Sequence, residues 1–303
     1  MRILLQFPEG LKAEALKEAK KLSSKGHEVF ISASHCFGGC DLCLDEARHI
    51  GAEKIIHFGH AEFCKVKGSI KVEYRPYFFE VDWKRLESPI KKLAELLRQA
   101  GAEKIALVFP IQHLKNAIPL RRKLRALGLT VTIKKGRKHV KHAGQILGCD
   151  TTAAEVEGID AVIYFGGGKF HPTGIESGAR VFCLDPHIND AYEITEEIEK
   201  LKKKKLGAIL AASQAKTFGI LLSTKNGQIN IPGALLAKRL IEKKGREAAI
   251  LVANEFSPTA LENFRTFDAY INTACPRIDE DTEAYGKPIV NLEDLKKLLE
   301  LMV

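Results

Sequence analysis

Short apolar runs alternate with amphipathic stretches along the first part of the chain. A run of four to eight apolar residues bounded by polar ones is typical of a buried strand, and apolar positions three or four apart predict a helix. The expected strands cover residues 2–7, 28–33 and 54–58, and the expected helices cover residues 11–25 and 42–50. Both helices stop at a glycine. This order indicates right-handed crossovers between parallel strands.

The same order then returns. Strands are expected at residues 104–109, 129–134 and 160–165, with helices at 115–127 and 151–156. Local matches accompany it: Phe7-Pro8 corresponds to Phe109-Pro110, Gly39-Cys40-Asp41 to Gly148-Cys149-Asp150, and His57-Phe58-Gly59 to Tyr164-Phe165-Gly166. The offsets of 102, 109 and 107 residues are nearly constant. We interpret this as an internal duplication.

A third, fainter copy follows, in which Cys275 comes after the third strand of the unit and not after the second. Its strands are expected at residues 218–223, 248–253 and 268–272, and its helices at 233–244 and 259–264. The predicted fold is therefore α/β, with three similar small parallel-sheet domains arranged around a central site. The predicted domains are residues 1–86, 87–190 and 191–303.

The length and net charge of the chain exclude few classes of function. The chain has 303 residues and a net charge of +9, but no basic motif interleaved with aromatic residues. We therefore expect no direct nucleic-acid partner. The first residues read as a strand and not as a signal peptide, and no apolar run could span a bilayer, which predicts a cytoplasmic protein without a membrane partner.

Seven cysteines, an odd number, do not predict a disulfide framework in such a chain. Cys40, Cys149 and Cys275 each follow an expected strand, one in each domain. Ligands bind beyond the carboxyl ends of parallel strands, so the three thiolates could meet at one centre. Thiolates favour iron–sulfur clusters or zinc. Three thiolates on a four-iron cluster leave one iron without a protein ligand.

The other cysteines leave alternatives open. Cys36, Cys40 and Cys43 have the Cys-x3-Cys-x2-Cys spacing of the conventional radical S-adenosylmethionine enzymes, although the barrel of that class is not predicted. A non-catalytic iron–sulfur or zinc module for electron transfer or sensing is a third hypothesis. We take Cys40 as the ligand, Cys36 and Cys43 as accessory or incidental, and Cys64 and Cys183 as packing residues.

Six motifs in register resemble the archaeal diphthamide synthase family, the 2-(3-amino-3-carboxypropyl)histidine synthases. They are Phe37-Gly38-Gly39-Cys40-Asp41-Leu42, His57-Phe58-Gly59-His60-Ala61-Glu62, Ile146-Leu147-Gly148-Cys149, Tyr164-Phe165-Gly166-Gly167-Gly168-Lys169-Phe170-His171, Thr224-Lys225-Asn226-Gly227-Gln228 and Ala274-Cys275-Pro276-Arg277. They extend over nearly the whole chain.

The resemblance implies a homodimer whose three domains each give one cysteine, here Cys40, Cys149 and Cys275, to a [4Fe-4S] cluster. The implied reaction moves the 3-amino-3-carboxypropyl group of S-adenosylmethionine, as a carbon radical, to C2 of a histidine in translation elongation factor 2. This is the first step of diphthamide formation, and an electron donor is required.

Several residues are candidate contacts for S-adenosylmethionine. Arg277 has a planar fork that matches the carboxylate, although an ion pair within the protein explains it equally well. His60 and Glu62 could reach the ammonium group or the substrate imidazole. The remaining candidates lie in glycine-containing loops, where the backbone can approach a ligand closely or simply turn: Gly166, Gly167, Gly227 and Gln228.

Overall fold

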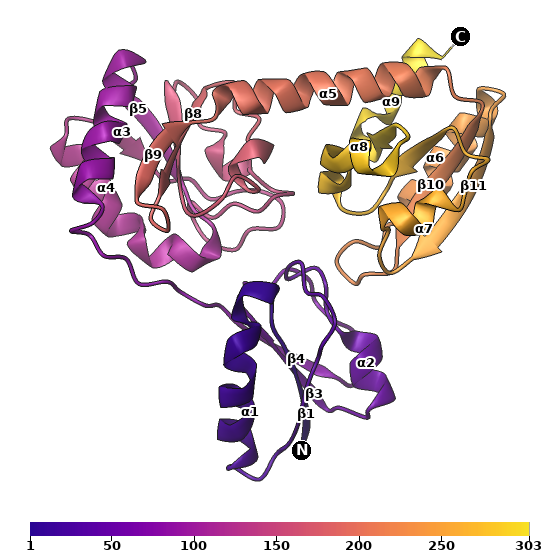
Figure 1. Ribbon diagram of the computed structural model, residues 1–303, viewed down its shortest axis with the longest axis horizontal. Helices are drawn as coiled ribbons and strands as arrows, with labels where there is room; N and C mark the ends of the chain where they lie inside the picture. Colours follow the sequence, from indigo (N-terminus) through magenta and orange to yellow (C-terminus); the bar gives the residue numbers. More distant parts are fainter. Residues whose placement is uncertain (303) are drawn as a thin grey trace. The chain divides into compact units, whose positions relative to one another are not determined.

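The computed structural model describes the backbone of residues 1–302 and the side chains of all of these except 281 and 282. By internal contacts the chain divides into two compact units, Met1–Ile198 and Glu199–Val303. The division falls within the long helix α5 (Thr195–Ser213), labelled in Figure 1. Each unit is described by itself.

The first sheet of unit 1 has the order β2-β1-β3-β4 and is entirely parallel. Alternate residues of its strands point to opposite faces, as the two-residue period of a strand requires. Helix α1 covers the face of Ile3 and Leu5, and α2 covers the face of Leu4 and Ile55. The elements are β1 (Arg2–Gln6), α1 (Ala15–Ser23), β2 (Glu28–Ile31), α2 (Leu44–His49), β3 (Lys54–Phe58) and β4 (Lys71–Arg75).

The second sheet of unit 1 repeats this order, β6-β5-β7-β8, and adds the antiparallel strand β9 at its edge. Helices α3 and α4 pack on one face, where Leu107 and Ile163 lie, and the loops around residues 146–154 cover the other. Its elements are α3 (Glu87–Gln99), β5 (Lys104–Val108), α4 (Ala117–Ala126), β6 (Thr130–Thr132), β7 (Ala161–Phe165), β8 (Arg180–Asp185) and β9 (Asp190–Glu193).

The sheet of unit 2 has the order β11-β10-β12-β13, again parallel. Its core joins Phe218 and Ile271 to α5, α6 and α9, and a smaller cluster around Tyr270 packs under α7. Its elements are β10 (Thr217–Ser223), α6 (Ile231–Lys243), β11 (Glu247–Ala253), α7 (Pro258–Glu262), β12 (Ala269–Asn272), α8 (Thr282–Tyr285), β13 (Ile289–Asn291) and α9 (Leu295–Leu301).

The shared order confirms the predicted α/β fold of three similar parallel-sheet domains. One expected helix is wrong: residues 151–156 form only a short 3-10 turn, Thr152–Ala154. Asp150 accepts hydrogen bonds from the backbone nitrogen and hydroxyl of Thr152, which fixes a turn there. The predicted boundary after residue 190 falls inside β9, which belongs to the second sheet. No helix of the described chain is long and apolar enough to cross a membrane.

Candidate functional site

The three cysteines of the first loop, between β2 and α2, have different surroundings. Cys43 directly precedes α2 and packs in the core with Leu4 and Ala47, and this burial raises the pKa of its thiol. Cys36 is also buried, at 4% exposure, whereas Cys40 is half-buried. Of these three, Cys40 is therefore the thiol best placed to reach a ligand from solvent.

Close packing fixes the backbone beside Cys40. A Cβ atom on Gly39 would lie 2.8 Å from the carbonyl oxygen of Ala61 and 3.1 Å from Cβ of Phe63, so only glycine fits. The hydroxyl of Tyr74 donates a hydrogen bond to the carbonyl of Gly39 at 3.1 Å. The loop that carries Cys40 is thus held against the loop that follows β3.

A buried glutamine organises the carboxyl end of this sheet. Gln6, the last residue of β1, donates from Nε2 to the carbonyl of Asp41 at 2.7 Å. Its Oε1 accepts from the backbone nitrogen of Cys43 at 3.3 Å and lies 2.8 Å from Nδ1 of His57. The amide therefore ties the cysteine loop to strands β1 and β3.

His57, His60 and Cys36 gather beside this amide. Nε2 of His57 lies 2.9 Å from Nδ1 of His60, and a ligand atom from each of the three residues lies within 4.8 Å of the others. Burial, followed by the effect of His60, lowers the pKa of His57 to about 3. Burial also lowers the pKa of His60 to about 4, although a hydrogen bond with the backbone of Phe58 opposes the change. Both imidazoles are neutral at pH 7.

The loop around Cys149 is held by the aspartate that follows it. The carboxylate of Asp150 accepts hydrogen bonds from the backbone nitrogens of His139 (2.6 Å) and Val140 (3.0 Å) and from the Thr152 hydroxyl (2.6 Å). Burial would raise the pKa of Asp150, but these hydrogen bonds outweigh it and the pKa is lowered. In the first domain Asp41 likewise accepts from the backbone nitrogen of Phe37. The aspartate of the repeated Gly-Cys-Asp motif therefore braces its own loop.

Asparagine side chains position the loop around Cys275. Nδ2 of Asn272 donates to the carbonyl of Cys275 and to Oδ1 of Asn291, both at 2.7 Å. Nδ2 of Asn291 donates to the carbonyl of Pro276 at 2.8 Å. Burial raises the pKa of the Cys275 thiol, and the neighbouring Arg277 opposes that effect. Like Cys40 and Cys149, Cys275 is half-buried.

The three titratable side chains expected to contact S-adenosylmethionine have protein partners. Arg277 is buried and pairs with Glu280, with an Nη1–Oε1 distance of 2.6 Å. Glu62 lies 3.9 Å from Nζ of Lys141, near the exposed surface. His60 contacts His57 as described. These contacts leave the three assignments as predictions.

The glycine candidates also have packing explanations. A Cβ on Gly166 would lie 2.7 Å from the Tyr164 hydroxyl, and one on Gly167 would lie 2.6 Å from Cδ2 of His187. Gly227 and Gln228 lie in a turn after β10, where the backbone nitrogen of Gln228 donates to the carbonyl of Lys225. Their contacts with a cofactor remain predictions.

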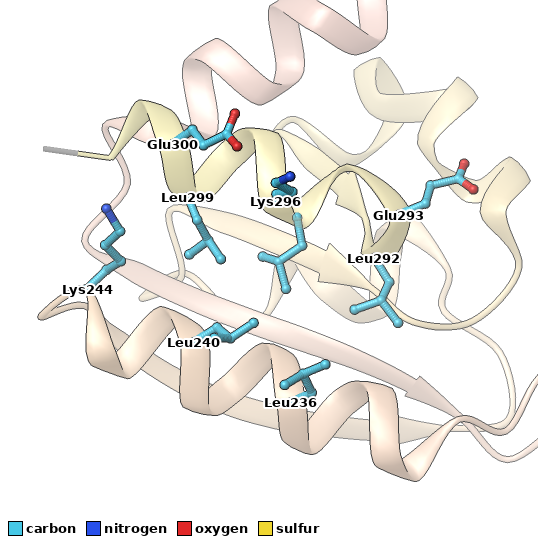
Figure 2. A pocket seen from close by; sticks show the side chains of 9 residues that line it. Leu236, Leu240, Lys244, Leu292, Glu293, Lys296, Leu299 and Glu300 are labelled. Carbon is cyan, nitrogen blue, oxygen red and sulfur yellow. The ribbon is translucent and has the colours of Figure 1, made fainter.

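Two hollows lie in unit 2. The larger, about 540 Å³, lies between α6 and α9, and Figure 2 shows leucine side chains such as Leu240 and Leu299 facing into it. The smaller, about 320 Å³, is lined by Asn272, Thr273, Ala274, Pro276 and Asn291 among others, directly around the Cys275 loop. The smaller hollow combines a largely apolar lining with the side chains of Asn272 and Asn291, a mixture common in ligand sites.

The sequence interpretation did not assign two residues of the first sheet, Gln6 and His57. Each is a polar residue inside a run of apolar strand residues, and both are buried. A buried polar side chain needs a hydrogen-bond partner, so their position was the available signal. Their pairing depends on register, because Gln6 is the β-ladder partner of His57.

Comparison with known proteins identifies the family. A family model described as "Putative diphthamide synthesis protein" matches residues 7–302. The chain is 32% identical over 303 residues to the 2-(3-amino-3-carboxypropyl)histidine synthase of Pyrococcus horikoshii, covering 99% of this chain and 86% of that protein. It is 29% identical to the protein of the same name from Methanocaldococcus jannaschii, covering 99% and 84%.

A solved structure agrees in fold. The crystal structure of Dph2 from Pyrococcus horikoshii with a 4Fe-4S cluster superposes with a TM-score of 0.87 at 31% identity. The match covers 99% of this chain and 86% of that one.

Proposed function

The chain belongs to the diphthamide synthesis protein family, and we propose that it transfers the 3-amino-3-carboxypropyl group of S-adenosylmethionine to a histidine of translation elongation factor 2. It is accordingly a transferase, a 2-(3-amino-3-carboxypropyl)histidine synthase. A carbon–sulfur bond of the sulfonium breaks and a carbon–carbon bond replaces C2–H of the imidazole. Methylthioadenosine and one proton leave, and the electron that starts the reaction is returned by the radical adduct, so the transfer is redox-neutral overall. The observation that carries this proposal is the family match over residues 7–302.

We assign Cys40, Cys149 and Cys275 as the ligands of a [4Fe-4S] cluster. Each is half-buried, and each follows a strand of its own sheet, at the edge where parallel sheets bind ligands. Their loops are braced by Gln6 and Tyr74, by Asp150, and by Asn272 with Asn291. Partly exposed thiols on rigid loops fit a metal centre that must also admit a substrate.

A cluster held by Cys40, Cys149 and Cys275 would supply the single electron that breaks the carbon–sulfur bond on the aminocarboxypropyl side of the sulfonium. The residues of the chain have to orient the cofactor. Arg277 is assigned to its carboxylate, for which it would exchange its present partner Glu280. His60 and Glu62 are assigned to the ammonium group or the substrate imidazole.

The backbone around Gly166, Gly167, Gly227 and Gln228 is assigned to the remaining polar groups of the cofactor. The proposal further includes a homodimer, a cytoplasmic location and an electron donor. It includes neither a membrane nor a nucleic-acid partner. The electron donor is needed to bring the cluster to its reduced state before the electron can pass to the sulfonium.

The test uses anaerobically purified protein with a reconstituted cluster, dithionite and S-adenosylmethionine. Methylthioadenosine should form, and elongation factor 2 should gain the 3-amino-3-carboxypropyl group on one histidine, as seen by mass spectrometry. Alanine at Cys40, Cys149 or Cys275 should remove most of the iron and the activity. Cys183→Ala, at a buried cysteine in β8, is the matched control and should keep both.

Two results would contradict the proposal. Release of 5′-deoxyadenosine in place of methylthioadenosine would indicate a conventional radical enzyme. Full iron content in both Cys149→Ala and Cys275→Ala would show that the cluster does not use these domains.

A further inference from the structure

We propose that Cys36, His57 and His60 form a second metal site, which binds one Zn²⁺ ion and is distinct from the cluster ligands. One sulfur and two imidazole nitrogens lie within 4.8 Å of one another at this place. Cysteine sulfur and histidine nitrogen are the ligands that zinc selects, and three protein ligands with a fourth from solvent is a common arrangement.

The hydrogen bonds of Gln6 fix which nitrogen of His57 faces the site. Nε2 of Gln6 donates to the carbonyl of Asp41, so Oε1 is the acceptor end of the amide. That oxygen lies 2.8 Å from Nδ1 of His57, which must therefore carry the proton. Nε2 of His57 is left with its lone pair toward His60. A ligand histidine whose other nitrogen donates to a carbonyl oxygen is the usual arrangement at metal sites.

The second histidine can join with a small rearrangement. Nδ1 of His60 lies 2.9 Å from Nε2 of His57. Two zinc-bound nitrogens at bond lengths of about 2.0–2.1 Å and a tetrahedral angle lie about 3.4 Å apart. His60 would move by a few tenths of an ångström and carry its proton on Nε2 instead of Nδ1. With zinc bound, that N–H could serve only the substrate imidazole, and the ammonium group would be left to Glu62. Cys36 would lose its thiol proton to solvent, so that binding releases one proton.

The place in the fold also suits a ligand. From β1 the chain adds β2 on one side of the sheet and then β3 on the other, although all strands stay parallel. Ligands bind beyond the carboxyl ends of the strands at such a switch point. Gln6 ends β1, and His57 is its partner near the end of β3. Cys36 lies in the loop that leaves β2. A metal here would tie that loop, which also carries Cys40, to the sheet.

The test separates this site from the cluster by metal analysis of four variants. In a Cys40→Ala background, which disables the cluster, chelator-treated protein is given Zn²⁺ and the bound metal is counted. One zinc per chain should remain in Cys40→Ala and in the control Cys40→Ala/Cys183→Ala. It should be lost in Cys40→Ala/Cys36→Ala and in Cys40→Ala/His60→Ala. Far-ultraviolet circular dichroism checks that each variant is folded. Replacing the half-buried His60 should disturb the fold less than replacing the buried Cys36.

Two further measurements sharpen the result. Co²⁺ in place of Zn²⁺ should give a thiolate-to-cobalt absorption band that disappears in Cys40→Ala/Cys36→Ser. The single variant Cys36→Ala should keep its iron after cluster reconstitution. Equal zinc in Cys40→Ala and Cys40→Ala/Cys36→Ala would overturn the site and leave only a hydrogen-bonded histidine pair. Loss of iron in Cys36→Ala that zinc-free wild-type protein does not show would overturn it as well, because Cys36 would then belong to the cluster.

Discussion

Oε1 of Gln6 lies 2.8 Å from Nδ1 of His57, across two neighbouring parallel strands at the carboxyl edge of the first sheet. Both side chains are buried, at 2% and 0% exposure. The amide also holds the backbone of Asp41 and Cys43. A single side chain therefore connects the sheet, the histidine pair and the loop of the proposed cluster ligand Cys40.

Replacing this amide should destabilise the first domain. Gln6→Leu leaves the Nδ1–H group of His57 and the backbone N–H of Cys43 buried without an acceptor. Each loss costs about 1–3 kcal/mol, so the free energy of unfolding should fall by roughly 2–6 kcal/mol. Denaturant unfolding of the metal-free protein measures it. Gln99→Ala, on the exposed side of α3, is the control and should change it by less than about 0.5 kcal/mol. A loss no larger than the control would contradict the role given to Gln6.

Acid should destabilise the metal-free protein at pH values above the ordinary pKa of a carboxylate. Burial lowers the pKa of His57 to about 3 and that of His60 to about 4, below the ordinary value of 6.5. Between about pH 4 and pH 6.5 the unfolded chain binds more protons, so stability falls as the pH falls. For His57 alone, the free energy of unfolding at pH 5 is about 2 kcal/mol lower than at pH 7. His113, whose pKa burial lowers to about 4, adds to the slope. Asp279, whose pKa burial raises to about 6, acts in the opposite sense and offsets part of it.

Unfolding free energy measured from pH 7 to pH 4 tests this. His57→Asn removes one of the titrating groups and should flatten the profile. A wild-type profile that is flat over this range would show that the histidines are not held neutral by the fold.

Gly39→Ala should displace the loop that carries Cys40. The new methyl group would lie 2.8 Å from the backbone oxygen of Ala61, and neither backbone can yield as a flexible side chain would. Overpacking of this kind costs about 1–3 kcal/mol. The melting temperature and the iron content should both fall. Gly10→Ala meets no atom within 4 Å and serves as the control. Retention of full iron content by Gly39→Ala would show that the loop tolerates the shift.

Cys43→Ala should keep its iron. Cys43 lies in the core beside α2, and burial raises the pKa of its thiol, which disfavours the thiolate that binds a metal. Iron and sulfide are counted after anaerobic reconstitution, with Cys40→Ala as the positive control for loss. If Cys43→Ala loses its iron as Cys40→Ala does, the conventional radical site of Cys36, Cys40 and Cys43 regains support.

The hydrophobic pattern of the sequence was enough to determine the fold class and the repeat. The first and third strands of each domain are buried and form continuous apolar runs, which made them recognisable. The second strands β2, β6 and β11 are edge strands with largely exposed residues, and they were recognised by short β-branched and apolar runs between polar residues. The fourth strands β4, β8 and β13 and the antiparallel strand β9 were not predicted. They join their sheets through long-range pairing that local pattern does not encode. The repeated Gly-Cys-Asp motif indicated Cys40 and Cys149 in the sequence. It did not indicate that the aspartate accepts hydrogen bonds from the backbone of its own loop.

The sequence by itself determined which cysteines recur, because a repeat keeps residue identity in register. Only the tertiary structure decided what surrounds them. It placed Cys43 in a core, Cys36 beside two histidines, and Asp150 on the backbone of its own loop. These relationships join residues from separate strands and loops. Strand register and side-chain packing create them, and neither follows from spacing along the chain.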